Sequence, residues 1–346
     1  MGRHNGRSVG FEIRNRLRTA PIDGTGCFEK RCDECVERFE ADSRVDKARL
    51  ARQDFPMPLD PRMRDSIATT LTDIACEAGD ILRRHHGGDC PHVLKPDGTP
   101  SSEADIESEK LILDALRRHY PTIPIISEES TYDLPPSELF FLVDPLDGTR
   151  DFLAGNPDYS VNICLIEGHR PVASAVAAPG IGRVWGAGVT AFEAAIHRGR
   201  PMSRNAIRVR KVPEDGLVAL VSRRHGDTET EACLAGLPIG QRRGVASALK
   251  FCLIASGEAD IYVRCGPTME WDTAAGDHVL TSAGGCVIVP SGRAITYGQY
   301  RIFYRNGPFA ALGDPSYTSR LGLPDRGPVL SPIRKGYSGD STPPPA

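Results

Sequence analysis

A short apolar run followed by two closely spaced acids constrains this 346-residue chain more than any other feature. Residues 138–143 read Glu-Leu-Phe-Phe-Leu-Val, which is short and apolar enough for a buried strand. Pro145 and Gly148 then predict that the strand stops and the chain bends. Asp144 and Asp147 are therefore expected at the carboxyl end of a strand, where open α/β sheets usually carry their ligand sites.

Two acids this close repel each other, and burying them without compensation is costly. A bound divalent cation removes that penalty, so we interpret the turn that carries Asp144 and Asp147 as part of a magnesium site. The alternative is an ordinary turn with solvated carboxylates, because Asp-Pro and Asp-Gly are both common turn formers. This segment alone does not separate the two interpretations.

Two further acidic segments favour the metal site. Residues 125–130 place Glu128 and Glu129 after a short apolar stretch, and hard oxygen ligands from separate strand ends suit Mg²⁺. A Glu-Glu pair by itself is more often solvated surface. Residues 270–276 place an acid near an expected helix start, followed by small residues that allow close packing. That acid, Asp272, has a simple helix N-cap as its alternative role.

A third segment, residues 95–105, is a turn that leads into a helical pattern over 103–119. Ser101 or Ser102 would cap this helix at its N-terminus. Capping does not explain Asp105 if that residue faces inward. Asp105 is therefore a further candidate for the same acidic site.

Together and in this order, these segments resemble the inositol monophosphatase superfamily of Mg²⁺-dependent, lithium-sensitive phosphatases. The resemblance rests on the acid pair after a strand, the Asp-Pro-Leu-Asp-Gly-Thr turn and the late Trp-Asp-Thr-Ala-Ala-Gly segment. It covers roughly residues 63–312. It implies an α/β (α+β) fold in which helices and sheets alternate in a five-layer αβαβα sandwich.

The resemblance also implies a set of ligands for two or three Mg²⁺ ions, namely Glu128, Asp144, the Leu146 carbonyl, Asp147 and Asp272. A divalent metal lowers the pKa of water and supplies a nucleophile at neutral pH. Glu128 and Thr149 would position and activate that water, with Asp105 supporting the water network or a third metal. Gly148 would let the backbone approach phosphate, with its own amide and that of Thr149 as donors.

Three segments of the second half, 222–225, 247–252 and 264–268, resemble the 3′(2′),5′-bisphosphate nucleotidase branch of this superfamily. In that branch a Ser and a Lys three residues apart, with a His and an Arg, hold the nucleotide and its second phosphate. The matching residues here are His225, Ser247, Lys250 and Arg264, together with Asp272. Helical spacing predicts that Ser247 and Lys250 share one helix face. Read singly, each basic residue is more often a solvated surface charge, and Ala246 and Ala248 depart from the branch pattern.

The substrate that this branch implies is 3′-phosphoadenosine 5′-phosphate, hydrolysed to AMP and phosphate, with 3′-phosphoadenosine 5′-phosphosulfate as a second candidate. Such an activity belongs to sulfur metabolism. One alternative is an inositol-1-monophosphatase or another sugar phosphatase of the same fold. Another is a homologue that binds nucleotide without turnover, although none of the metal carboxylates is missing from the sequence. A third is a binding module that uses the N-terminal cysteines.

Composition limits the partners. A formal net charge of −3 gives no sign of a nucleic-acid surface, so the expected partner is a small-molecule bisphosphate nucleotide. No apolar run is long enough for a transmembrane segment, and the N-terminus lacks the apolar stretch of a secretory signal. We expect a cytoplasmic protein with reduced thiols and leave open a peripheral position at the inner face of the cell membrane. The oligomeric state is not fixed by the sequence.

The chain is expected to divide into three parts. Residues 1–60 are rich in charge and predict a disordered extension, or a stretch created by an upstream start codon. Residues 61–313 form the phosphatase domain, with a metal-binding half at about 61–190 and a substrate half at about 191–313. Residues 314–346 are rich in Pro, Gly and Ser and predict a disordered tail.

The N-terminal extension contains a C-x₄-C-x₂-C cluster formed by Cys27, Cys32 and Cys35. Zinc and iron–sulfur sites usually need a fourth ligand, and none stands at a regular spacing, so a solvated segment is the favoured interpretation. Cysteines within apolar patterns are expected to be small core residues, namely Cys76, Cys164, Cys252 and Cys286.

Periodicity predicts the main elements of the domain. Helices are expected at 63–86, 103–119, about 246–257 and from Asp272 onward. Strands are expected at 123–127, 138–143, 159–166, 171–178, 183–189 and 259–263.

Overall fold

The computed structural model describes residues 58–328 apart from 96–97, 131–133 and 224–225. Several sequence predictions therefore lie outside the described residues: most of the N-terminal extension, the cluster of Cys27, Cys32 and Cys35, the end of the tail, and the substrate residue His225. The described residues all belong to one unit, Phe55–Ala346.

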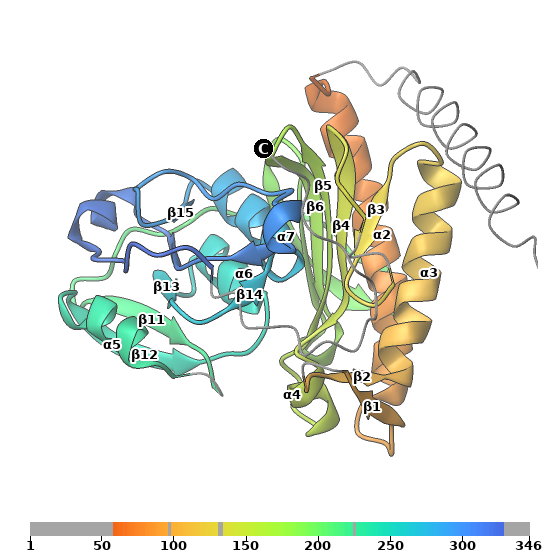
Figure 1. Cartoon of the computed structure of the whole chain (residues 1–346), viewed down its shortest axis with the longest axis horizontal. Helices are drawn as coiled ribbons and strands as arrows, with labels where there is room; N and C mark the ends of the chain where they lie inside the picture. The colour runs from red at the N-terminus through yellow and green to blue at the C-terminus, as the bar shows by residue number, and fades with distance from the viewer. Residues whose placement is uncertain (1–57, 96–97, 131–133, 224–225, 329–346) are drawn as a thin grey trace, which may run out of the picture. The chain divides into compact units, whose positions relative to one another are not determined.

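Two long helices, α2 (Pro61–His85) and α3 (Glu103–His119), lie side by side and form the first layer (Figure 1). Asp60 begins α2 by accepting a hydrogen bond from the Met63 amide at 3.0 Å, and proline occupies the first turn, where its missing N–H is tolerated. The apolar positions that predicted α2 are buried, including Ile67, Leu71, Ile74, Ala78 and Leu82. The predicted bounds of α3 are confirmed at both ends.

The second layer is an eight-stranded sheet in which β3 and β4 are parallel and the other pairs are antiparallel. Its strands run in the order β10-β8-β7-β6-β5-β4-β3, with β9 paired to β8. Their bounds are β3 (Ile125–Ser127), β4 (Leu139–Asp147), β5 (Ser160–Glu167), β6 (Arg170–Ala178), β7 (Arg183–Ala187), β8 (Ala191–His197), β9 (Arg200–Pro201) and β10 (Asn205–Ala206).

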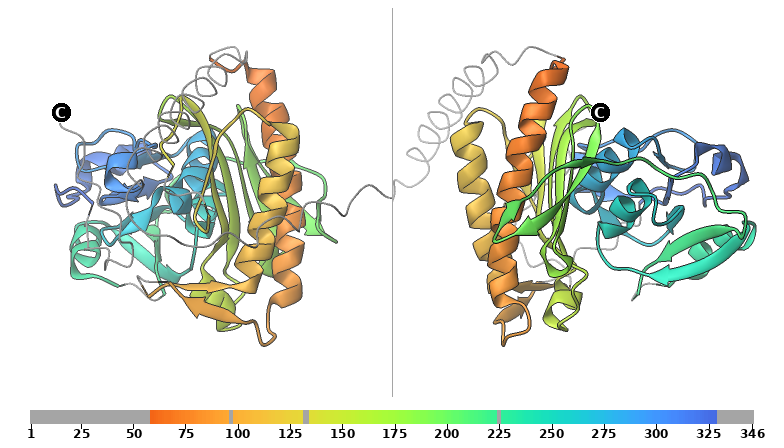
Figure 2. Two further views of the ribbon diagram at one scale, coloured as in Figure 1. Left: turned by 45° about the vertical axis from the view of Figure 1, so that its right-hand side comes forward. Right: turned by 180° about the vertical axis from the view of Figure 1, so that it is seen from behind.

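The central strands β5 and β6 are buried along nearly their whole length, because helices cover both faces of the sheet. Helices α2 and α3 cover one face, and α6 (Leu249–Ala255) and α7 (Glu270–Ser282) cover the other (Figures 1 and 2). The predicted strand positions are confirmed to within a few residues, except that β4 extends further than expected.

The fourth and fifth layers are a second sheet and a single outer helix. The second sheet has the strand order β12-β11-β13-β17-β15, and α5 (Thr228–Ala235) packs on its outer face against β13. The strands are β11 (Leu217–Val221), β12 (Ile239–Gly244), β13 (Ile261–Arg264), β15 (Cys286–Ile288) and β17 (Phe309–Leu312). The predicted αβαβα layering is confirmed.

Short elements complete the described chain. They are the hairpin of β1 (His92–Leu94) and β2 (Pro100–Ser102), the pair β14 (Thr268–Met269) and β16 (Arg305–Asn306), helix α4 (Thr149–Leu153), and the 3₁₀ turns η1 (Pro179–Ile181), η2 (Tyr300–Ile302) and η3 (Pro315–Arg320). Among the described helices, none has the length and apolar character that crossing a bilayer would require.

Two predicted boundaries differ from the structure. The first sheet takes in strands as far as Ala206, so the division between the two halves falls later than residue 190. The start of the predicted disordered tail is ordered. Residues Tyr317, Leu321 and Leu323 pack on an apolar cluster of the second sheet, and that burial outweighs the local Pro, Gly and Ser content.

The predicted core cysteines are buried at Cys76, Cys164 and Cys252, whereas Cys286 is half-buried at the start of β15. All of the cysteines within the described residues are free thiols.

Close packing between α6 and α7 depends on Gly276, as the small residues of that segment predicted. A methyl group at this position would lie 2.6 Å from Cδ2 of Phe251, too close for van der Waals contact. We expect Gly276→Ala to lower the free energy of unfolding by about 1–3 kcal/mol through overpacking. Gly236→Ala is the matched control, because nothing lies within 4 Å of its added methyl group, and it should stay within about 0.5 kcal/mol of wild type. Chemical denaturation measures both; equal effects would contradict the packing argument.

Candidate active site

Two parallel strands bring the first two acids together. Glu128 directly follows β3, and Asp144 lies within the neighbouring β4. The Glu128 amide donates to the Val143 carbonyl at 3.2 Å, which extends the parallel pairing by one residue and fixes Glu128 beside Asp144. Glu128 thus lies just past the carboxyl end of β3, and Asp144 lies three residues before the carboxyl end of β4, not at the strand end that the sequence predicted.

The prediction that Pro145 ends the strand is wrong. Strand β4 continues through Asp147, with a bulge that inserts one extra residue opposite β5, since Asp144 pairs with Asn162 and Asp147 with Ser160. A proline is tolerated at a bulge because it has no ladder hydrogen bond to donate there. Bulges bend a strand and change where its side chains point, and this one redirects the segment between the two acids.

Asp272 reaches the site from α7, which packs on the face of the sheet opposite to α2 and α3. It is the third residue of this helix, so its alternative role as a simple N-cap is wrong. The Met269 amide donates to Asp272 Oδ2 at 2.8 Å, which holds the carboxylate at the positive end of the helix dipole. The helix start lies two residues earlier than predicted.

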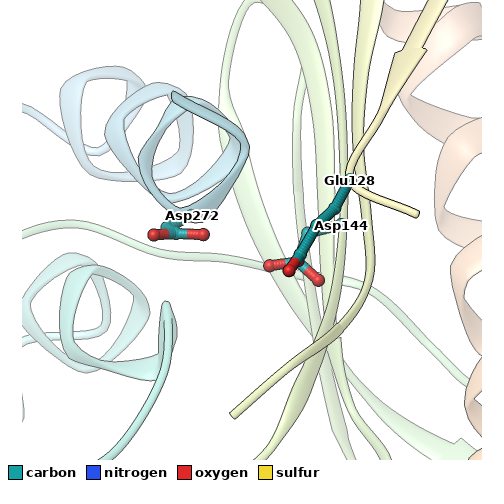
Figure 3. A group of neighbouring side chains, drawn as sticks. All are labelled: Glu128, Asp144 and Asp272. Atoms are coloured by element: carbon teal, nitrogen blue, oxygen red, sulfur yellow. The ribbon is translucent and has the colours of Figure 1, made fainter. Parts of the chain in front are cut away.

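Glu128, Asp144 and Asp272 each offer one carboxylate oxygen, and these three atoms lie within 4.8 Å of one another. Figure 3 shows Glu128 and Asp144 together on the sheet, with Asp272 facing them from α7. Burial, reinforced by the neighbouring acids, raises the pKa of Asp144 and of Asp272 well above the usual range. Burial likewise raises the pKa of Glu128 to about 7, although the charge of Lys95 opposes the shift.

This donor set fits a divalent cation. Three hard oxygen donors from separate chain segments converge, and their mutual repulsion is the penalty that such an ion removes. All three residues of this acidic group are among the metal ligands expected from the sequence.

Asp147 lies beside the triad rather than in it. Its carboxylate accepts the Ala248 amide at 2.6 Å and the Asn162 side chain at 3.4 Å. Its negative charge still acts on both Asp144 and Asp272, raising the pKa of each. The Leu146 side chain is buried in the core, while its carbonyl oxygen lies 3.1 Å from Thr149 Oγ.

Thr149 and Asp105 meet on the same side of this turn. The Thr149 hydroxyl lies 3.2 Å from Asp105 Oδ1 and 3.1 Å from the Leu146 carbonyl, so its single proton can be donated to either. Asp105 is buried and faces inward, which is the orientation that made it a candidate for the acidic site. Burial raises its pKa to about 6. Its other oxygen accepts the Ser102 amide and hydroxyl in a capping box, so one carboxylate both caps α3 and contacts the candidate site.

Sequence analysis missed Lys95, which lies in the loop between β1 and β2. Its ammonium group is 2.8 Å from Glu128 Oε1 and 2.5 Å from Glu129 Oε1, and Ser101 donates to the other oxygen of Glu129 at 2.8 Å. In the sequence, Lys95 lies in the turn of residues 95–105 that also contains Asp105. A single lysine in a turn is usually solvated, so its position in the sequence does not predict a role in the site.

The second half contributes Lys250 next to the acids. Its side chain is buried, its ammonium group donates to the Ser247 carbonyl at 2.7 Å, and it lies 4.9 Å from the centre of the Tyr262 ring. Burial lowers the pKa of Lys250 to about 8, although the negative charge of Asp147 opposes the shift.

The prediction that Ser247 and Lys250 share a helix face is wrong. Helix α6 begins at Leu249, and Ser247 precedes it with a left-handed φ of 56°. The side chain of Lys250 folds back onto this turn instead of standing beside Ser247. Gly148 approaches the same turn, because a methyl group at that glycine would lie 3.6 Å from Ser247 Cβ.

Arg264 ends β13 and is buried. Its Nη2 donates to the Pro267 carbonyl at 3.2 Å, while its buried Nε has no hydrogen-bond partner within the described part of the chain. The guanidinium charge also contributes to lowering the pKa of Lys250. Arg264 lines a cavity of about 100 Å³ together with Ser222 and Thr230.

Comparison with known proteins agrees with this geometry. The model of the inositol monophosphatase family matches residues 63–317. The chain is 35% identical over 246 residues to the 3′(2′),5′-bisphosphate nucleotidase CysQ of Shigella flexneri, covering 68% of this chain and 96% of that protein.

Solved structures share the fold. The crystal structure of CysQ from Bacteroides thetaiotaomicron superposes with a TM-score of 0.62 at 27% identity, covering 71% of this chain and 97% of that one. An IMPase from Thermotoga maritima gives a TM-score of 0.57 at 22% identity over 71% of this chain and 91% of that one, which supports the fold alone. On the family match and on these similarities, the chain belongs to the inositol monophosphatase family, a family of phosphatases.

Proposed function

We propose that the protein is a Mg²⁺-dependent 3′(2′),5′-bisphosphate nucleotidase that removes the 3′-phosphate of 3′-phosphoadenosine 5′-phosphate. The observation that carries the proposal is two buried cationic side chains, Lys250 and Arg264, both of which interact electrostatically with Asp272 of an acidic triad suited to a divalent metal. The metal bound by the acidic triad would account for hydrolysis of the 3′-phosphate. The side chains of Lys250 and Arg264 would account for binding of the second phosphate of the substrate.

Glu128, Asp144, Asp147, Asp272 and the Leu146 carbonyl would hold the metal, with two or three ions per site. When bound, Mg²⁺ supplies charge stabilisation for the phosphoryl group and lowers the pKa of water. The chain's own residues then orient the reactants. Above its pKa of about 6, Asp105 is ionised and accepts a hydrogen bond from the Thr149 hydroxyl, which would leave the Thr149 lone pairs free to orient the attacking water.

The second phosphate would lie against Lys250, Arg264 and the Ser247 turn. Arginine provides a planar fork for phosphate oxygens, and the unpartnered Nε of Arg264 is a donor still to be satisfied. The left-handed turn at Gly148, with φ of 92°, lets the backbone pass close to Ser247 and to the bound substrate. The 5′-phosphosulfate analogue would satisfy the same cations.

Phosphate release separates this function from its alternatives. We expect Mg²⁺-dependent release from 3′-phosphoadenosine 5′-phosphate in excess of that from inositol 1-phosphate or fructose 1,6-bisphosphate. Asp147→Asn should reduce turnover by about a hundredfold or more, because a neutral amide is a poor Mg²⁺ ligand. Asp260→Asn is the matched control, since that buried carboxylate binds Arg210 and the Val218 amide at the opposite end of β13 from Arg264.

Preference for either sugar phosphate would contradict the nucleotide assignment while leaving the phosphatase intact. Nucleotide binding without any release would favour a non-catalytic homologue instead.

The charge of Lys250 provides a test of the second phosphate. Lys250→Met keeps most of the buried stem and removes the charge, so KM for the bisphosphate nucleotide should rise about tenfold or more. KM for a simple phosphomonoester should change little, because it lacks the second phosphate. Steady-state kinetics on both substrates measure the difference. An equal rise for both would show that Lys250 only supports the fold of the loop at Ser247.

Metal binding should change how stability depends on pH. Asp105 and Glu128 have pKa values raised from 3.8 and 4.5 to about 6 and about 7, so their contribution to stability is full below the unfolded values and lost as pH rises through the folded ones. Without metal, the thermal midpoint should therefore fall between about pH 4 and about pH 7. Saturating Mg²⁺ should reduce this fall, because the cation favours the ionised carboxylates.

Part of the fall should remain with Mg²⁺, since Asp277 is buried with a pKa of about 7 and is not a member of the triad. Thermal unfolding in EDTA and in Mg²⁺ compares the two conditions. Identical slopes would count against a metal at these carboxylates.

A further inference from the structure

A loop of the second half connects the two chain segments that carry Asp272 and Glu128. We call residues 297–306 the strap. At its end, β16 pairs with β14 immediately before α7, with Asn306 opposite Thr268. The Tyr304 hydroxyl donates to the Leu134 carbonyl, in the segment that follows Glu128. The strap thus contacts the backbone just before α7 and also Leu134, which lies six residues after Glu128 in the chain.

Glu270 joins the strap to the start of α7. This carboxylate is fully buried and accepts the Gly298 amide at 2.6 Å and the Gln299 amide at 2.8 Å. The Glu270 amide in turn donates to the Tyr304 carbonyl at 2.8 Å. Because backbone amides of the strap use both oxygens of this buried carboxyl group, the contact holds the backbone two residues before Asp272.

The strap itself has a strained backbone. Phe303 and Tyr304 are consecutive non-glycine residues with φ of 55° and 56°, a conformation that side chains with a Cβ rarely adopt. Such a pair persists only where surrounding contacts determine it. Tyr304 supplies those contacts: it is fully buried, and its ring centre lies 6.1 Å from that of Trp271, the neighbour of Asp272.

A buried, hydrogen-bonded glutamate can also be an ordinary core residue. What distinguishes Glu270 from that case is its position two residues before Asp272, where it exchanges hydrogen bonds with both ends of the strap. We propose that Glu270 and Tyr304 are positioning residues, which hold Asp272 against Glu128 and Asp144 so that their carboxylates stay within reach of one cation. This inference rests on the proposed metal role of the triad.

Direct titration of Mg²⁺ into the full-length protein by calorimetry, without substrate, tests the inference. Glu270→Gln replaces one acceptor oxygen by a donor that faces a backbone N–H, and it should weaken Mg²⁺ affinity by about tenfold. Tyr304→Phe keeps the ring and removes the hydroxyl bond to Leu134, and it should weaken affinity in the same direction. At saturating Mg²⁺, KM for the phosphate substrate should remain that of wild type in both variants.

Asp260→Asn serves again as the control, because it removes a charge from another fully hydrogen-bonded, buried carboxylate. It is expected to lower the thermal midpoint while leaving Mg²⁺ affinity unchanged. Wild-type affinity in Glu270→Gln, or an equal loss in Asp260→Asn, would overturn the inference. If Glu270→Gln does not fold, Tyr304→Phe decides alone: weaker binding supports the strap, and unchanged binding refutes it. Failure of the wild-type protein to bind Mg²⁺ would overturn the proposed function as well.

Discussion

Repulsion among buried carboxylates is the constraint on which the rest of the structure depends. Glu128, Asp144 and Asp272 come from a strand end, a strand interior and a helix start, and their oxygens converge within 4.8 Å. Glu128 raises the pKa of both aspartates and Asp272 raises that of Asp144, so the folded chain holds the three acids together against an unfavourable interaction. Such an arrangement persists where the surrounding scaffold is rigid and where a ligand of opposite charge offsets the repulsion.

The layers of the fold supply that rigidity. Both helices of the first layer and both helices of the third pack on one sheet, whose central strands are buried on two faces. Helix α3 also reaches the site directly, because Ser108 donates to the Pro145 carbonyl at 2.8 Å and Ser127 donates to Glu109 at 2.5 Å. The two chain segments that carry Asp144 and Glu128 are therefore fixed from the same helix.

Local patterns in the sequence predicted what depends on local physics. The bounds of α2 could be placed within about two residues from apolar spacing, and those of α3 from spacing together with the expected serine cap. The layered architecture came from resemblance, not from periodicity. The short strands β11, β12, β15 and β17 gave no usable pattern, since their pairing is set by partners distant in the chain.

Site residues divide in the same way. Acids next to apolar strands stood out because uncompensated burial is costly, and the structure brings Glu128, Asp144 and Asp272 together. Two predictions of local geometry were wrong, because Pro145 lies in a bulge of β4 and Ser247 precedes α6. Both depend on tertiary contacts that override the usual preference of the residue. Lys95 was missed because only its partners, Glu128 and Glu129, distinguish it from a surface lysine.

The capping box at the start of α3 has an evolutionary consequence. One oxygen of Asp105 caps the start of α3, and the other accepts the Thr149 hydroxyl at the candidate site. Under the proposed function, replacing the Asp105 carboxylate would affect both the capping of α3 and the rate of turnover, so selection would act on both properties at once. Homologues that abandon phosphate chemistry would still be expected to retain an acid here for the sake of the helix.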